Sequence, residues 1–248
     1  MTVLPAMRGR NALVTGSTRG IGRAIAVAFA QEGAAVFLHG LERDSALEVT
    51  LGAQCAGFDG TDLALPDGAD RLFTAAAAAM GSVDILVLCA SAEIREMWDR
   101  VTPAAEATQL AVNFSASVRL LCRAVPAMSA RGWGRVLAIG SIQETLPNPD
   151  CLVYVATKAA QTAMMRTLAR HASADGVTFN TIKPGAIETD RNAARLADPA
   201  FRASVVARIP AGRLGQADDC AGIAVALCAD GCGYVNGAEI AVAGGLAL

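Results

Sequence analysis

Near the N-terminus, a glycine-rich turn separates a short apolar run from a longer, alanine-rich one. Ala12–Val14 has the composition of a buried strand, and Ala24–Ala30 has that of a helix. The turn between them contains Gly16, Gly20 and Gly22. Glycines let a backbone approach phosphates closely, and the helix start supplies free N–H groups and positive potential. The segment therefore predicts the pyrophosphate site of a dinucleotide-binding α/β fold.

Apolar runs and helical stretches keep alternating along the rest of the chain. This pattern predicts a doubly wound parallel sheet covered by helices on both faces, in three layers. A content of 53% hydrophobic and 18% charged residues suits such a sheet, and we expect residues 1–248 to form a single domain. Seven strands are expected, at Asn11–Val14, Ala35–His39, Gln54–Phe58, Asp84–Leu88, Arg135–Gly140, Val177–Ile182 and Glu239–Val242.

Ser141, Tyr154 and Lys158 have the chemistry of a proton-transfer site. Ser141 follows an apolar run, so its hydroxyl is expected at a strand's carboxyl end, where open α/β sheets bind ligands. Tyr154 and Lys158 are four residues apart in a stretch with helix-forming composition, which puts both on one helix face. Alone, this pair also fits a solvated helix. An ammonium beside a phenol favours the phenolate, so we expect a lowered pKa for Tyr154.

The glycine spacing Gly-x-x-x-Gly-x-Gly, followed by Ser141, Tyr154 and Lys158, resembles the short-chain dehydrogenase/reductase family over nearly the whole chain. The resemblance implies a Rossmann-type fold and hydride transfer between NAD(P) and a carbonyl or secondary alcohol. Ser141 would donate a hydrogen bond, Tyr154 would exchange the proton, and Lys158 would lower the phenol's pKa and hold the nicotinamide ribose. Asn113 matches the family's helix asparagine, which bends a helix, here 104–130, and holds a water near the lysine.

The resemblance also implies a set of cofactor contacts. An aspartate after the third strand binds the adenine amine; helix N-capping by Thr61 or Asp62 is a competing and compatible explanation for the acids here. A Pro-Gly-x-x-x-Thr turn after the sixth strand wraps the nicotinamide amide. The matching residues are Gly16, Ser17, Thr18, Arg19, Gly20, Ile21, Gly22, Asp59, Ala90, Tyr154, Lys158, Pro184, Gly185, Ile187 and Thr189.

The end of the second strand bears on the choice between NAD and NADP. An acid there would bind the ribose hydroxyls and repel a 2′-phosphate, but the chain has Gly40. Arg19 and Arg43 are placed to neutralise a 2′-phosphate. Arg43 lies two residues beyond the usual position, after Glu42, and also fits a solvated helix start. We favour NADP(H), with NAD(H) as the alternative.

Two segments depart from the family pattern. Leu88-Cys89-Ala90-Ser91 replaces the usual Asn-Asn-Ala-Gly, and Ala243 replaces the aspartate of Val-Asp-Gly-Gly. The first change removes side chains that tie neighbouring strands together in relatives. It is the basis for one alternative function, a non-catalytic nucleotide-binding protein.

A substrate lid is expected at about residues 190–215, which hold five arginines. An anionic substrate held by Arg191 or Arg195 is one interpretation, and a solvated helix face is the other. Gln143 and Glu144, just after Ser141, are expected to face the substrate and suggest a small, polar, hydroxylated one. The second candidate among enzymes is an NAD-dependent polyol or sugar dehydrogenase, which the 2′-phosphate contacts at Gly40 and Arg43 would distinguish from an NADP(H) enzyme.

Composition argues against several other partners. The net charge of −2 without a basic run gives no reason to expect nucleic acid. The longest charge-free runs have 12 residues, too short to span a bilayer, and no signal peptide is recognisable, so we expect a cytoplasmic protein. The seven cysteines and two histidines are scattered, which predicts no metal site. The resemblance implies a homo-oligomer, a tetramer or a dimer.

Overall fold

A computed structural model describes residues 6–248 of the chain. These residues form one parallel sheet in the order β3-β2-β1-β4-β5-β6-β7. The order reverses between β1 and β4, and the carboxyl ends of these strands open the crevice in which such sheets bind ligands. The strands are β1 (Asn11–Val14), β2 (Ala35–His39), β3 (Cys55–Asp59), β4 (Ile85–Leu88), β5 (Gly134–Ile139), β6 (Val177–Pro184) and β7 (Glu239–Val242).

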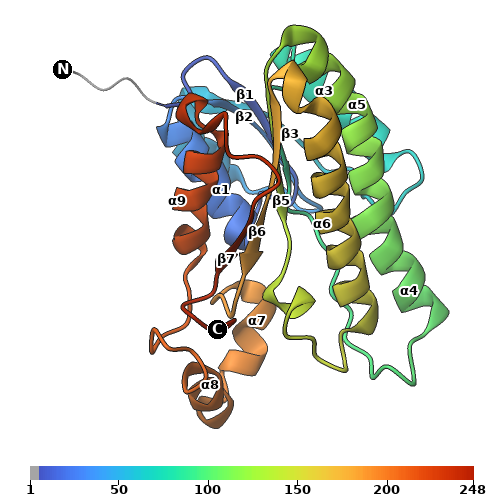
Figure 1. The fold of residues 1–248 in the computed structure, drawn as a ribbon, viewed down its shortest axis with the longest axis vertical. Helices are drawn as coiled ribbons and strands as arrows, with labels where there is room; N and C mark the ends of the chain where they lie inside the picture. The colour runs from blue at the N-terminus through green and yellow to red at the C-terminus, as the bar shows by residue number, and fades with distance from the viewer. Residues whose placement is uncertain (1–5) are drawn as a thin grey trace.

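Helices cover both faces of this sheet (Figure 1). One face carries α1 (Gly20–Gln31), α2 (Ser45–Leu51) and α9 (Ala217–Cys228), and the other carries α3 (Gly68–Met80), α5 (Ala116–Arg131) and α6 (Leu152–Ala172). Two short helices, α7 (Asp190–Leu196) and α8 (Pro199–Val206), lie beyond the carboxyl end of the sheet, at the bottom of Figure 1. No helix within residues 6–248 combines the length and apolar character needed to span a membrane.

The five inner strands, β2, β1, β4, β5 and β6, are apolar on both sides because each contributes to two cores, whereas the edge strands β3 and β7 are only partly buried. In β1, Ala12 and Val14 pack towards α1 and α9, whereas Leu13 packs towards α3 and α5. The same alternation in β4 separates Ile85 from Leu86. A strand buried on both faces reads as a continuous apolar run, which explains why the inner strands are visible in the sequence.

All seven predicted strands are present; β1, β2 and β7 have the predicted boundaries, and the other four differ by one or two residues. β3 lies one residue later, β4 begins one residue later and β5 lies one residue earlier than predicted. β6 runs two residues further, to Pro184, because it remains paired with β7 as far as Val242.

The predicted helix 104–130 is interrupted. It consists of α4 (Pro103–Gln109), the π-helical segment η2 (Leu110–Ser115) and α5. Thr102 caps the start of α4, with its hydroxyl accepting a hydrogen bond from the Ala105 amide, and Pro103 occupies the first turn. The π segment contains Asn113, so the change of helical geometry falls on the residue that the family resemblance singles out.

Candidate active site

The glycine turn lies where β1 ends and α1 begins. Gly16 and Gly20 have positive φ values of 66° and 55°, which favour glycine. A Cβ on Gly16 would lie only 2.8 Å from Ala90 Cα, so the turn packs directly against the end of β4. Arg19 precedes α1 and gives it no side-chain cap, and the first turn of α1 has no acidic residue. The backbone N–H groups of this first turn are therefore available to an anion.

Thr15 supplies the tie between strands that the changed segment Leu88–Ser91 puts in doubt. Its hydroxyl donates to Val87 O at 3.0 Å and accepts from the backbone N–H groups of Cys89 at 2.9 Å and Ala90 at 3.0 Å. Thr15 is 1% exposed. A single buried hydroxyl thus connects the ends of β1 and β4 without the two asparagines usual in the family.

His39, at the end of β2, also supports the glycine turn, and its role was not predicted. Its Nδ1 accepts from Gly16 N at 3.1 Å, which leaves Nε2 to donate to Thr61 O at 2.9 Å. Burial lowers the pKa of His39, in keeping with this neutral tautomer. Its position at a strand end, next to the turn, was the one available signal.

Thr18 and Gly40 face each other at the ribose end of the crevice. A Cβ on Gly40 would overlap the Thr18 hydroxyl and lie 2.8 Å from Thr18 Cγ2. There is thus no room for an acidic side chain at position 40 while Thr18 keeps its place. Arg19 is exposed and makes no ion pair with any residue of 6–248.

Arg43 and Asp59 have protein partners as well as their predicted cofactor roles. The Arg43 guanidinium donates to both carboxylate oxygens of Glu48, at 2.6 and 2.8 Å, and this contact raises its pKa. Asp59 accepts from Thr61 N at 2.7 Å, and neither Thr61 nor Asp62 caps the next helix, which begins at Gly68 after Asp67. The Arg43 charge is therefore compensated by Glu48, which leaves Arg19 as the freer of the two cations.

Ser141 and Tyr154 meet at the carboxyl end of β5. Ser141 follows β5 by two residues, and Tyr154 lies in the first turn of α6; both are 6% exposed. Burial raises the pKa of Tyr154 to about 12, against the opposing effects of Arg191 and of the nearby Ser141 side chain. The expectation of a lowered pKa is wrong, because desolvation of the phenolate outweighs the nearby positive charge.

Lys158 lies one helical turn beyond Tyr154 and is 1% exposed. Its Nζ is 5.9 Å from the centre of the Tyr154 ring and donates to Ile139 O at 2.7 Å and Gln161 Oε1 at 3.4 Å. Burial lowers the pKa of Lys158 to about 8. The ammonium remains the main form at neutral pH, but it is held mainly by protein acceptors.

Asn113 uses its whole side chain to join three segments. Its Nδ2 donates to Ala92 O at 2.8 Å and Thr157 Oγ1 at 3.0 Å, and its Oδ1 accepts from Ala92 N at 2.8 Å. Thr157 Oγ1 donates in turn to Tyr154 O at 2.8 Å. Asn113 is 0% exposed. The side chain thus fixes the loop after β4 against the helix that carries Tyr154 and Lys158.

Glu144 does not face the substrate, contrary to the prediction. Its carboxylate accepts from Ser141 N at 2.9 Å and pairs with Lys183 Nζ at 3.1 Å, and its side chain is 5% exposed. Lys183 also pairs with Glu239 at 2.6 Å. Burial opposes the charge on Lys183, but its bonds to Glu239 and Glu144 raise its pKa. Gln143, the other residue of that prediction, accepts from Asn148 Nδ2 at 3.2 Å.

The turn after β6 reaches the glycine turn. Thr189 lies over Gly20, since a Cβ there would be 3.4 Å from Thr189 Cγ2. Gly185 follows Pro184 and packs on Ala243, and Ile187 is 4% exposed, with its carbonyl accepting from Asn192 Nδ2 at 2.9 Å. The predicted pyrophosphate and nicotinamide segments therefore lie together, although their sequence positions are about 170 residues apart.

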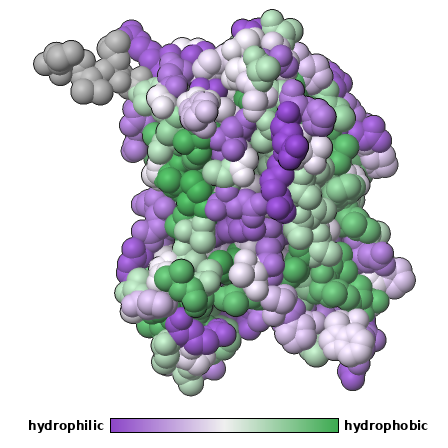
Figure 2. Space-filling model, viewed as in Figure 1, coloured by the Kyte–Doolittle hydropathy of each residue, from purple (hydrophilic) through white to green (hydrophobic). Residues whose placement is uncertain are grey.

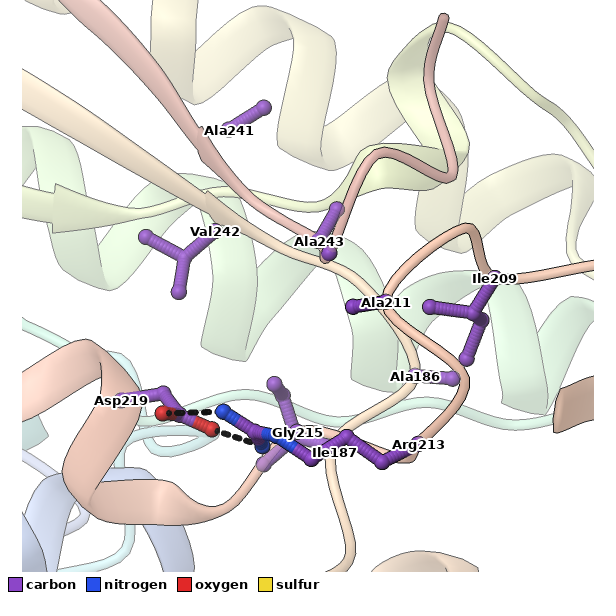
Figure 3. A pocket seen from close by; sticks show the side chains of 11 residues that line it. Ala186, Ile187, Ile209, Ala211, Arg213, Gly215, Asp219, Ala241, Val242 and Ala243 are labelled. Carbon is purple, nitrogen blue, oxygen red and sulfur yellow. Dashed lines mark hydrogen bonds and ion pairs between the residues drawn. The ribbon is translucent and has the colours of Figure 1, made fainter.

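A cavity of about 270 Å³ lies behind this turn (Figure 3). Arg213 and Asp219 face each other at one side, 2.7 Å apart, and alanine side chains, including Ala243, lie at the other. None of Asn113, Ser141, Tyr154 and Lys158 lines it. The cavity is therefore not where a substrate would meet the phenol.

A charged group lies over Tyr154, and sequence reasoning identified only its arginine from α7. Glu93 pairs with Arg95 and, at 3.6 Å, with Arg191; Arg95 also pairs with Asp150 at 3.0 Å. Arg191 lowers and Glu93 raises the pKa of Tyr154, after the larger effect of burial, so both lie near the phenol. Glu93 and Arg95 lie in the loop after β4, which was the signal available.

Other lid arginines bind elsewhere. Arg195 stacks on Phe201 at 4.6 Å, Arg202 pairs with Glu188, and Arg213 pairs with Asp219. For these three, the interpretation as a solvated or locally paired face is the better one. Arg191 instead donates to Ser91 O at 2.9 Å, at the edge of the site.

Known proteins resemble this chain over almost its full length. A protein-family profile described as "Enoyl-(Acyl carrier protein) reductase" matches residues 16–247. The 3-oxoacyl-[acyl-carrier-protein] reductase of Escherichia coli (strain K12) is 35% identical, over 96% of this chain and 97% of its own.

Two solved structures share the architecture. One is a 3-oxoacyl (acyl-carrier-protein) reductase from Agrobacterium tumefaciens C58 with NADP bound, which is 40% identical with a TM-score of 0.93, over 98% of this chain and 96% of its own. The other is a putative NAD(P)-dependent gluconate 5-dehydrogenase from Beutenbergia cavernae with bound NADP, which is 34% identical with a TM-score of 0.91, over 98% and 99%.

Proposed function

The chain belongs to the short-chain dehydrogenase/reductase family, and from this premise we propose that it reduces the carbonyl group of a small polar substrate through Ser141, Tyr154 and Lys158. It is an oxidoreductase that acts on C=O and CH–OH groups with NADP(H). The observation that carries the proposal is the arrangement of a buried phenol, a hydroxyl and an ammonium at the carboxyl ends of β4 and β5. We also propose that residues 1–248 form one domain.

The crevice residues fit a pyrophosphate-linked dinucleotide. The glycines of the turn from Gly16 to Gly22 carry no side chains of their own, and the uncapped start of α1 offers N–H groups to phosphate oxygens. Arg19 would meet the 2′-phosphate, and the turn from Pro184 to Thr189 would hold the nicotinamide. When bound, NADPH supplies the hydride.

The protein groups divide the remaining work. The Tyr154 phenol donates a proton to the carbonyl oxygen, and the Ser141 hydroxyl donates a hydrogen bond to the same atom as negative charge develops there. The Lys158 ammonium supplies positive charge beside the phenol. A Tyr154 pKa of about 12 keeps the phenol protonated at neutral pH, as the role of proton donor requires.

Three further residues position the reacting groups: Asn113, Glu144 and Thr15. Asn113 fixes α6 against the loop after β4, Glu144 holds the Ser141 backbone, and Thr15 fixes the end of β4 against the glycine turn. Because these contacts are buried, their loss would leave polar atoms unpaired next to the reacting groups.

The charged group over the phenol favours a hydroxylated substrate. Glu93 can accept hydrogen bonds from substrate hydroxyls, and Arg191 can bind a carboxylate or hydroxyl oxygen. A polyol or sugar dehydrogenase is therefore the second candidate. Relatives include proteins named glucose 1-dehydrogenase and L-rhamnose 1-dehydrogenase, at 32% and 33% identity.

We propose a homo-oligomer in which α4, η2 and α6 meet a second copy. Leu110 and Leu152 are 40% and 52% exposed and line a groove with Phe114, Val153 and Ala156. Figure 2 shows apolar side chains along this part of the surface. Leu152→Glu should dissociate the assembly in size-exclusion chromatography with light scattering. A parental mass for this variant would exclude this face.

The proposal is tested by nucleotide titration followed by turnover. NADPH should bind more tightly than NADH by nucleotide fluorescence, and Arg19→Ala should reduce that preference. In a screen of sugars, sugar acids and ketones with NADPH, Tyr154→Phe should lower kcat by about 10²- to 10⁴-fold. Tyr234→Phe is the matched control, because Tyr234 is the other tyrosine and is fully exposed. Parental turnover by Tyr154→Phe would exclude the mechanism.

A further inference from the structure

Two polar side chains lie inside the otherwise apolar contact between α5 and α6. Gln161 is 0% exposed and Ser117 is 4% exposed, and they are surrounded by core residues such as Leu120, Leu121 and Met165. Burying an amide and a hydroxyl in such a contact costs free energy unless each finds hydrogen-bond partners. Their partners lead to the proposed active site.

A continuous chain of hydrogen bonds connects Lys158 with the π segment. Lys158 Nζ donates to Gln161 Oε1 at 3.4 Å, Gln161 Nε2 donates to Ser117 Oγ at 2.9 Å, and Ser117 Oγ donates to Asn113 O at 2.9 Å. The chain begins at the ammonium and ends on a backbone carbonyl that cannot turn. Each hydrogen therefore has one direction in which to point.

We propose that Gln161 is a positioning residue for Lys158: its amide oxygen holds the ammonium in place, and Ser117 fixes the amide in the orientation that this requires. The Ser117 hydrogen points to Asn113 O, so the Ser117 oxygen is left to accept from the Gln161 NH₂ group. The opposite end of that amide, its oxygen, then faces Lys158. A flipped amide would set an NH₂ group against an ammonium. The inference rests on the proposed function, since it gives Lys158 a role.

The other groups around Lys158 do not replace the hydrogen bond to Gln161 in stabilising its charge. Burial and Arg191 lower the pKa of Lys158. Glu144, which lies after β5, and Glu93, in the loop after β4, raise it. The Cys89 thiol is neutral, because burial raises its pKa, and the Tyr154 phenol is neutral for the same reason. Only Ile139 O and Gln161 Oε1 accept directly from Nζ among residues 6–248. Gln161 is the one that substitution can remove.

The chain offers a direct measurement, because it contains only two lysines, Lys158 and Lys183. In protein labelled with [¹³C]lysine, the Cε resonance reports the charge on each amine as pH is raised, without substrate or nucleotide. We expect Gln161→Leu to lower the Lys158 titration midpoint by about one pH unit, since it removes a hydrogen bond to a charged group while keeping similar volume. The Lys183 resonance serves as an internal control.

Three further variants separate positioning from packing. Gln161→Glu keeps an acceptor and should raise the midpoint instead of lowering it. Ser117→Ala frees the amide to turn and should lower the midpoint by less than Gln161→Leu. Thr162→Val is the matched control, because Thr162 is adjacent, 1% exposed and has a buried hydroxyl without a partner in residues 6–248. It should leave the midpoint unchanged.

Turnover provides the second measurement. In NADPH-dependent reduction, the pH at which Gln161→Leu loses activity on the alkaline side should fall by about one unit, with Gln161→Glu restoring it. A parental Lys158 midpoint in both Gln161→Leu and Gln161→Glu would overturn the inference; if the leucine variant does not fold, a parental midpoint in the glutamate variant overturns it. Because the titration uses no substrate, it stays informative even if Tyr154→Phe retains activity and the proposed function fails.

Discussion

Thr18 occupies the space beside Gly40 that an acidic side chain at the end of β2 would need. Gly40→Asp alone should therefore weaken NADPH binding at least about tenfold through repulsion of the 2′-phosphate, without producing tight NADH binding. Gly40→Asp with Thr18→Gly should gain NADH binding, because the aspartate then has room to reach the ribose hydroxyls. Fluorescence titration with both nucleotides measures this, and Thr18→Gly alone is the control. Tighter NADH binding by Gly40→Asp alone would contradict the steric argument.

At the residue scale, the sequence predicted the reacting groups better than their electrostatics. Tyr154 and Lys158 follow from helical spacing, a local property, and the structure puts Ser141 beside the phenol. The pKa of Tyr154 does not follow from spacing, because it depends on how completely the rest of the fold removes water from the phenol. Glu93 and Arg191 were not predicted as a pair for a similar reason: 98 residues separate them.

The π segment of the α4–α5 helix depends on Asn113. Asn113→Ala leaves Ala92 N, Ala92 O and Thr157 without their partner, so we expect the free energy of unfolding to fall by about 2–4 kcal/mol. The loop after β4 should also exchange its amide hydrogens faster, and turnover should fall. Denaturant unfolding and hydrogen exchange measure these effects.

Asn148→Ala is the control for this prediction, because Asn148 is exposed and its side chain bonds only to Gln143 among residues 6–248. Unchanged exchange at Ala92 in Asn113→Ala would show that the loop is held by other contacts. Asn113→Asp should not restore stability, because a carboxylate cannot donate to Ala92 O.

Strands were easier to predict than the helix interruption. Each of the five inner strands is buried on both faces, so its apolar run is visible in the sequence, whereas the end of β6 depends on pairing with β7. No local sequence pattern predicts the π-helical geometry of Leu110–Ser115. Its side-chain partners Ala92 and Thr157 lie 21 and 44 residues away, so only the assembled fold favours this geometry.

At the scale of the whole molecule, the site combines burial with charge. The helices on one face and the sheet remove Lys158 from water, and the resulting penalty appears as a pKa of about 8 instead of the usual 10.5. At neutral pH, burial of the Lys158 ammonium, which the reaction needs, therefore reduces the free energy of unfolding. Protein acceptors such as Ile139 O reduce this cost without removing it.

This penalty predicts how stability changes with pH. The folded pKa of Lys158 lies below the unfolded one, so between about pH 8 and 10.5 the unfolded chain binds more protons, and stability from this group rises with pH. Relative to Lys158→Met, the parent's free energy of unfolding should rise by about 2 kcal/mol between pH 7.5 and 9.5. Urea unfolding of both proteins at each pH measures the difference, in which the contributions of the cysteines and other titrating groups cancel. A constant difference over this range would mean that Lys158 has the same pKa in the folded and the unfolded chain, so that its burial does not disfavour the ammonium.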